Sequence, residues 1–74
     1  MIKAYLLVKM EPGADLDSTS ESLAGPGITS VEMLMGPYDA IVAVEAPDPR
    51  TLGEIAKRVR RCPGVQDSMT CPVM

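Results

Sequence analysis

The chain has 74 residues and a net charge of −3, and 46% of its residues are apolar, yet it contains no histidine, phenylalanine or tryptophan. A chain of this length forms one small domain, and such domains bury only roughly 60% of the surface that the unfolded chain exposes. They therefore need a further stabiliser, such as disulfides, a metal ion or association with another chain. Two cysteines are too few for a disulfide scaffold, and without histidine they cannot form a structural zinc site. Oligomerisation is the stabiliser that remains.

The missing histidine also limits the chemistry available to the chain. It removes the commonest general acid or base and the base of most hydrolase triads, and it disfavours a metal hydrolase. We therefore predict no metal, no cofactor and no enzymatic activity. An enzyme that uses carboxylates, lysines, tyrosines or thiols is the alternative.

Charge is distributed unevenly along the chain. Residues 1–49 hold two lysines against eight acidic residues, whereas residues 50–61 hold five basic residues against Glu54. An acidic chain is a poor nucleic-acid ligand, so we expect no direct DNA binding. The basic cluster is typical of a solvated helix that ends in cations, where the helix dipole favours them.

No targeting segment is recognisable. Met1 leads directly into a strand-like run, without the parts of a signal peptide, and no apolar stretch approaches the ~20 residues of a membrane span. Cys62 and Cys71 are interpreted as buried free thiols, with a disulfide or a reactive site as the alternative. These features predict a cytoplasmic protein without a membrane partner.

The first half of the chain predicts a strand and a helix. Residues 2–10 alternate in polarity with period two, which indicates a strand, and Glu11-Pro12-Gly13 ends it. Residues 14–24 predict a helix with a thin apolar stripe at Leu16 and Leu23, although its serines and threonine are mediocre helix formers.

Two further strands are predicted at residues 28–35 and 38–46, separated by a turn at Gly36-Pro37. Within the second of these strands the alternation assigns one face to Ala40, Val42, Val44 and Ala46. The six methionines of the chain are interpreted as filler of the core, because methionine adapts to irregular gaps.

The last part of the chain predicts a helix and a strand. Asp48 and Pro49 form a typical helix start, and the apolar spacing of the following residues is that of an amphipathic helix. Pro63-Gly64 ends this helix. Residues 65–73 predict a fourth strand, in which Pro72 indicates an edge or a bulge.

The predicted order is strand, helix, strand, strand, helix, strand, and the two halves echo each other at an offset of 36 or 37 residues. This order predicts a single α+β domain over residues 1–74 with a ferredoxin-like βαββαβ sandwich: a four-stranded antiparallel sheet with two helices on one face. The other face would be open and apolar, which usually indicates an interface. We expect two copies to dimerise through it, using Tyr5, Leu7, Leu34, Ile41 and Ala43.

Three motifs carry a resemblance to a known family: Gly36-Pro37-Tyr38-Asp39, Pro63-Gly64-Val65 and Ser68-Met69-Thr70. At this spacing the chain resembles, over residues 1–74, the stand-alone effector-sensing (RAM) domain of the leucine-responsive/asparagine regulator (Lrp/AsnC) family. The resemblance implies a ferredoxin-like fold, dimers made through the sheets, and further assembly, often into octamers. It also implies an amino-acid effector bound between dimers near the hairpin that contains Gly36.

Full-length members of this family carry an N-terminal helix-turn-helix, which residues 1–74 do not contain. The resemblance therefore implies a module linked to transcription regulation that senses a metabolite or assembles with full-length relatives, rather than a direct reader of DNA.

The chemistry of an amino-acid site can be assigned to individual residues. Asp39 offers an anion for an ammonium group, and backbone N–H groups around Gly36 and Tyr38 offer donors for a carboxylate. Ser68 and Thr70 add hydroxyls, and Leu34 and Met35 are suited to line an apolar pocket.

Each of these residues also has a purely structural interpretation. Gly36 can shape a turn, Asp39 can cap backbone amides, Tyr38 can be an interface aromatic, and Ser68 and Thr70 can be ordinary strand residues. Three other functions stay open beside sensing: a small dimeric ferredoxin-like enzyme, a purely structural assembly domain, and nucleic-acid binding through residues 50–61.

Overall fold

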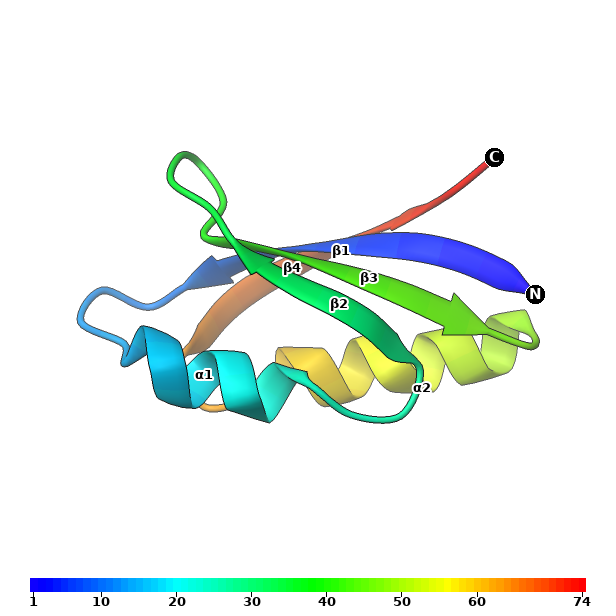
Figure 1. Ribbon diagram of the computed structural model, residues 1–74, viewed down its shortest axis with the longest axis horizontal. Coiled ribbons are helices and arrows are strands. Elements are labelled where there is room, and N and C mark those ends of the chain that lie inside the picture. The colour runs from blue at the N-terminus through cyan, green and yellow to red at the C-terminus, as the bar shows by residue number, and fades with distance from the viewer.

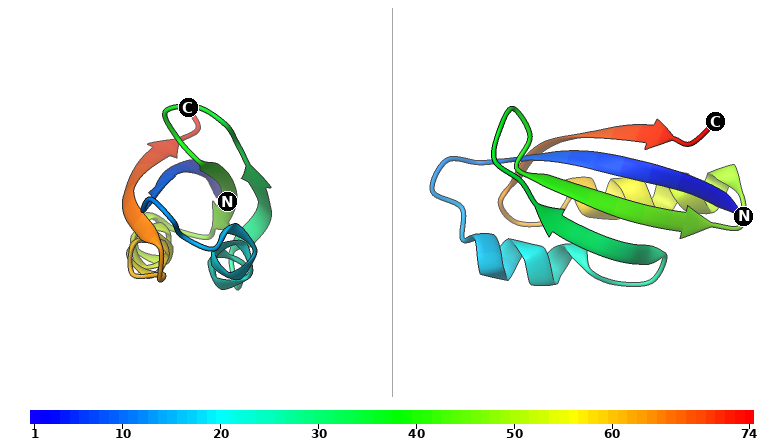
Figure 2. Two further views of the ribbon diagram at one scale, coloured as in Figure 1. Left: turned by 90° about the vertical axis from the view of Figure 1, so that its left-hand side faces the viewer. Right: turned by 45° about the horizontal axis from the view of Figure 1, so that its top comes forward.

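The computed structural model describes the backbone of residues 1–74 and every side chain except that of Leu16. The sheet has the strand order β2-β3-β1-β4, and all neighbouring strands are antiparallel. Both helices cover one face of this sheet (Figures 1 and 2), so the predicted ferredoxin-like fold is confirmed. The elements in chain order are β1 (Ile2–Met10), α1 (Leu16–Leu23), β2 (Ile28–Met33), β3 (Ala40–Ala46), α2 (Pro49–Arg60) and β4 (Val65–Pro72).

The central strands β1 and β3 supply most of the core. Their register places Leu6 opposite Val42, and both side chains are fully buried beneath the helices. Period-two alternation then places the whole set Ala4, Val8, Met10, Ala40, Val44 and Ala46 on the same buried face. The faces expected from the sequence are therefore those of the structure.

Both helices begin at an aspartate that accepts hydrogen bonds from their first turn. Asp48 Oδ1 accepts from the backbone N–H of Thr51 at 2.7 Å, and this bond holds the pKa of Asp48 below its ordinary value. Asp15 caps α1 in the same way, through the backbone N–H of Asp17 at 3.1 Å. The apolar stripe expected on this helix consists of Leu16 and Leu23. Leu23 is fully buried, and the Leu16 side chain lies outside the described part of the chain.

Predicted element ends differ from the structure around the β2–β3 connection. The strand expected at 28–35 ends at Met33, and the strand expected at 38–46 begins at Ala40. The backbone N–H of Leu34 donates to the carbonyl of Asp39 at 2.7 Å, which closes a loop over the intervening residues. Pro37 has no N–H with which to extend the ladder. The helix expected at 14–24 is likewise shorter, at 16–23.

The interpretation of the methionines as core filler is wrong for five of the six. Met10 alone is buried, at 6% exposure, whereas Met35 and Met74 are fully exposed, Met1 is largely exposed, and Met33 and Met69 are 38% and 49% exposed. Valine, leucine, isoleucine and alanine already fill the face beneath the helices. The methionines stand on the outer strands, the hairpin and the chain ends. Cys62 and Cys71 are free thiols and are half-buried.

Two glycines with the same backbone conformation provide a matched test of packing beneath α1. Gly13 and Gly64 have φ of +82° and +89°, but only at Gly64 would a Cβ meet a neighbour, the Thr19 hydroxyl at 2.7 Å. Gly13→Ala is expected to lower the free energy of unfolding by about 1 kcal/mol, from backbone strain alone. Gly64→Ala adds overpacking and should cost about 1–3 kcal/mol more, measured by urea denaturation. Equal losses in the two variants would contradict this packing.

Candidate functional site

The face of the sheet away from the helices is apolar at its centre. Tyr5 of β1 lies opposite Ala43 of β3, and Leu7 lies opposite Ile41, so these four side chains share that face. Tyr5 is 46% exposed, although a tyrosine ring normally finds a packing partner. We refer to this surface, made by Tyr5, Leu7, Ile41 and Ala43, as the open face.

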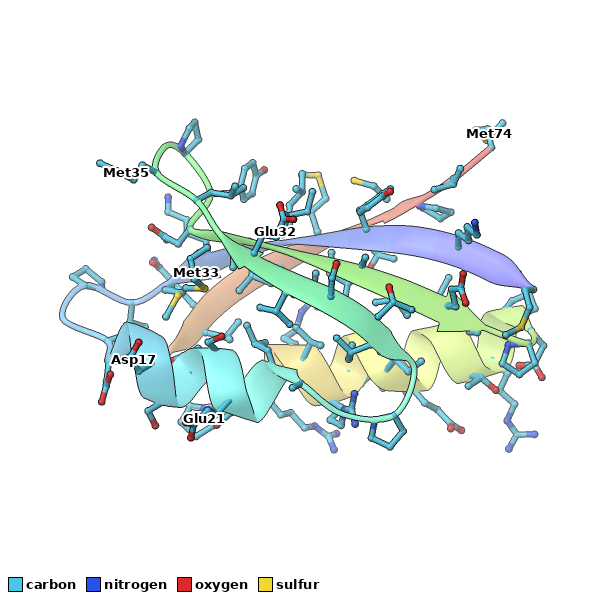
Figure 3. The ribbon with its side chains drawn as sticks, viewed as in Figure 1. Asp17, Glu21, Glu32, Met33, Met35 and Met74 are labelled. Atoms are coloured by element: carbon cyan, nitrogen blue, oxygen red, sulfur yellow. The ribbon has the colours of Figure 1, made fainter. Side chains whose placement is uncertain are left out.

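The strand register adds two residues to the open face that were not expected from the sequence. Met69 of β4 pairs with Leu7, and Cys71 pairs with Tyr5. Neighbouring strand residues point to opposite faces, so the burial of Ser68 assigns Met69 and Cys71 of the same strand to the open face. Figure 3 shows how the two faces alternate on β2, where Glu32 points away from the helices and Met33 points toward them. Leu34, expected on the open face, lies just beyond β2 and is 41% exposed.

The open face has a polar rim around its apolar centre. Lys3 and Glu45 form an ion pair at one end, with 3.9 Å between Nζ and Oε1. Glu32, Lys9 and Asp67 belong to the same face by their register. An apolar centre within a charged rim is the usual composition of a protein interface.

The loop of residues 34–39 joins β2 to β3 and rises on the side of the sheet away from the helices (Figures 1 and 2). Met35 at its tip is fully exposed, while Tyr38 and Asp39 at its base are half-buried. We refer to this loop as the hairpin. The hairpin therefore stands at the border of the open face, with its tip in solvent.

Asp39 ties the base of the hairpin to the end of β1. Its backbone N–H donates to the carbonyl of Val8 at 2.9 Å, and its Oδ2 accepts from the backbone N–H of Met10 at 2.8 Å. The sheet register shifts between Lys9 and Met10, and this irregularity in the β1–β4 ladder lies beside the Asp39 carboxylate. Asp39 thus has a structural role, while its second oxygen has no hydrogen bond within the described side chains.

The structure does not bring Ser68 and Thr70 to the hairpin within one chain. They pair with Val8 and Leu6, so they share the helix-facing side of the sheet, and β1 separates them from β3. Ser68 is buried and Thr70 is exposed. Leu34, Met35, Gly36, Tyr38 and Asp39 do lie together, because they are consecutive in the hairpin.

Two further findings concern the described residues as a whole. Among the described side chains, no three of the acidic, cysteine or histidine type are grouped so that they could hold a metal ion. Neither helix is long and apolar enough to cross a membrane.

A family model named the Lrp/AsnC ligand binding domain matches residues 3–74 of the chain. A homocitrate synthase from Sulfurisphaera tokodaii is 34% identical over 74 residues, which are 99% of this chain and 16% of that protein. The chain thus spans about a sixth of this curated relative's length.

Solved structures match the fold over the whole chain. The protein TTHA0845 from Thermus thermophilus is 25% identical, with a TM-score of 0.89 over 100% of this chain and 94% of that chain. The transcriptional regulator NMB0573 from Neisseria meningitidis, solved in complex with L-methionine, is 20% identical. It has a TM-score of 0.86 over 99% of this chain and 49% of that chain.

Substitutions of Asp39 can separate its structural role from its charge. Asp39→Ala leaves the part-buried Met10 N–H without its acceptor and is expected to lower the free energy of unfolding by about 1–3 kcal/mol. Asp39→Asn keeps an oxygen acceptor at the same position and should cost under about 1 kcal/mol. Urea denaturation of both variants measures the difference. If Asn and Ala destabilise equally, the carboxylate does not act through this hydrogen bond.

Proposed function

Because the chain belongs to the Lrp/AsnC ligand-binding domain family, we propose that it is a module that senses an amino acid and assembles with further copies, linked to the regulation of transcription. The family match over residues 3–74 is the observation that carries this function. The methionine complex of the Neisseria regulator supports an amino acid as the class of effector.

We place the ligand at the hairpin. The Asp39 carboxylate is an acceptor for the ligand's ammonium group, because one of its oxygens is held by Met10 while the other has no hydrogen bond within the described chain. The backbone N–H groups at Gly36 and Tyr38 are donors for the ligand's carboxylate. The exposed side chains of Leu34 and Met35 supply apolar contacts for its side chain.

A site made by the hairpin alone is too exposed to exclude water, since the tip at Met35 stands free. We propose that a neighbouring dimer closes it, so that the ligand lies at the interface between dimers. In this arrangement the exposed Thr70 contacts a ligand that is held by another chain's hairpin, whereas Ser68 is buried and does not reach it. That would explain how residues that one chain keeps apart can contribute to one site.

The dimer itself is proposed to form through the open face. Tyr5, Leu7, Leu34, Ile41 and Ala43 would pack against the same residues of a second copy, as two sheets pack face to face. Such packing supplies the apolar burial that a 74-residue chain cannot provide alone. Dimers of this kind could assemble further, up to octamers, or combine with full-length regulators of the family.

We propose that the domain binds rather than catalyses, because the family is one of ligand binding and the chain has no histidine. A second candidate follows from the homocitrate synthase match. A segment that is 34% identical belongs to a protein with an enzyme's name, so the sensed ligand could regulate an enzyme instead of transcription. The two candidate functions are distinguished by measuring the activity of a partner enzyme with and without the ligand. A change in that activity supports regulation of an enzyme.

A panel of the twenty amino acids in a thermal-shift assay tests the sensing function. A ligand present at 100 times its dissociation constant adds about 2.7 kcal/mol to the stability, which raises Tm measurably. Asp39→Asn should remove this shift for the same ligand, because it keeps the fold but removes the charge that pairs with the ammonium group. A purely structural assembly domain would show no shift with any amino acid.

Light scattering after size exclusion tests the dimer. The unchanged chain should have the mass of a dimer or a larger even assembly, and Ile41→Lys should reduce it to a single chain by burying a charge in the interface. Gly53→Lys adds the same charge on α2, where an added Cβ meets nothing within 4 Å, and should leave the mass unchanged. Retention of the wild-type mass by Ile41→Lys would exclude the open face as the interface.

A further inference from the structure

A cavity lies at the other end of the sheet from the hairpin. It has a volume of about 510 Å³, within the range of roughly 300–1,000 Å³ typical of small-molecule sites. Its lining comes from Met1, the α1–β2 loop, the end of β3 with the residues that follow it, and α2. We refer to it as the α2 pocket; the lining residues used below are Pro26, Glu45, Pro47, Glu54, Ile55 and Arg58.

The α2 pocket and the hairpin are separate places. The hairpin meets β3 at Ala40, whereas Glu45 and Pro47 of the pocket lie at and beyond the opposite end of that strand. Seven strand residues at about 3.3 Å each separate the two ends by roughly 20 Å. A ligand at the hairpin therefore cannot also occupy the α2 pocket.

The wall formed by the α1–β2 loop is held by hydrogen bonds from two other elements. The backbone N–H of Glu45 donates to the carbonyl of Gly27 at 2.9 Å, and Arg58 Nη2 donates to the carbonyl of Pro26 at 3.1 Å. Gly27 has φ of +84°, and a Cβ there would collide with the Ile55 side chain. The absence of a side chain at Gly27 therefore lets the loop approach α2 closely, so the pocket has a preformed wall.

The lining combines an apolar floor with both signs of charge. Ile55, Pro26 and Pro47 are apolar, and most of the exposed lining is apolar. The Arg58 guanidinium has five N–H donors and uses one on Pro26, so it has donors left for an anion. Glu54 brings a carboxylate to the same cavity, whereas Glu45 lines it from β3, where its side chain belongs to the open face.

The Glu54 carboxylate is accessible to a ligand. Its Oε1 lies 3.8 Å from Nε of Arg50. This ion pair is long and solvent-exposed, and such pairs contribute only ~0–1 kcal/mol. A cationic ligand group can therefore displace Arg50 from Glu54 at little cost.

We propose that the α2 pocket is a second small-molecule site, for compounds that join an apolar body to both a carboxylate and an ammonium group, such as aliphatic α-amino acids. The ligand's carboxylate pairs with Arg58, its ammonium group pairs with Glu54, and its apolar body lies on Ile55 and the two prolines. The proposal shares its ligand class with the proposed function but uses a different site, so each can fail alone.

Amide chemical shifts of the ¹⁵N-labelled full chain, titrated with L-norleucine, test the proposal. Norleucine should shift the amides of Gly27, Thr51 and Ile55 along one binding curve. Arg58→Gln should weaken this curve about tenfold, as expected for loss of a charge-assisted hydrogen bond, whereas Arg61→Gln, which removes the same charge from outside the pocket, should not. No saturable shift at these amides at norleucine concentrations on the order of 10 mM, or equal effects of the two variants, would overturn the proposal.

Arg58→Gln also removes the hydrogen bond to Pro26 and can therefore perturb the α1–β2 loop. Ligands with a single charge and the variant Glu54→Gln provide a test that does not depend on this loop. Hexanoate should bind without help from Glu54, whereas hexylamine and norleucine should lose affinity in the exposed variant Glu54→Gln. Uniform effects of Glu54→Gln on all three compounds would contradict the assigned charges. Shifts at Gly36 and Asp39 alone would overturn the α2 pocket but leave the proposed function standing. Shifts at the pocket alone would support the α2 pocket, while the amino-acid panel tests the proposed function separately.

Discussion

The antiparallel pairing of β1 with β3 is the interaction on which the rest of the molecule depends. It sets Leu6 against Val42 beneath the helices and, one residue along, Leu7 against Ile41 on the opposite face. Period two thus divides the same two strands between a buried core and an uncovered apolar surface. The helices can cover only one of these faces, since both crossover connections lie on the same side of the sheet. The fold is therefore stabilised on one side by its own helices, and the other side is the surface through which we propose that it dimerises.

Asp39 shows how one side chain can serve both the fold and a site. Its carboxylate accepts from Met10 N–H and so anchors the hairpin to β1 at the place where the β1–β4 register shifts. An anchored carboxylate loses little conformational freedom when a ligand arrives, which favours binding. The structural interpretation and the binding interpretation of this residue are thus compatible, because each uses a different oxygen.

The sheet also separates two surfaces that differ in character. The hairpin end is thin and exposed, and the proposed ligand there depends on a neighbouring copy. The α2 pocket at the other end is formed within one chain by Gly27, Ile55 and Arg58. A ligand at the hairpin would bind only when chains assemble, whereas a ligand in the α2 pocket can bind a single chain.

The sequence by itself determined the order of elements, the two faces of β1 and β3, and the start of α2 at Asp48, because alternation, helical spacing and capping are local properties of neighbouring residues. It also placed the hairpin residues together, since they are consecutive. Only the tertiary structure decided the bond from Asp39 to Met10, which spans 29 positions, and the exposure of five methionines. It alone separated Ser68 and Thr70 from the hairpin and assembled the α2 pocket, because the register between strands and the contact of a loop with a distant helix depend on packing that no local pattern contains.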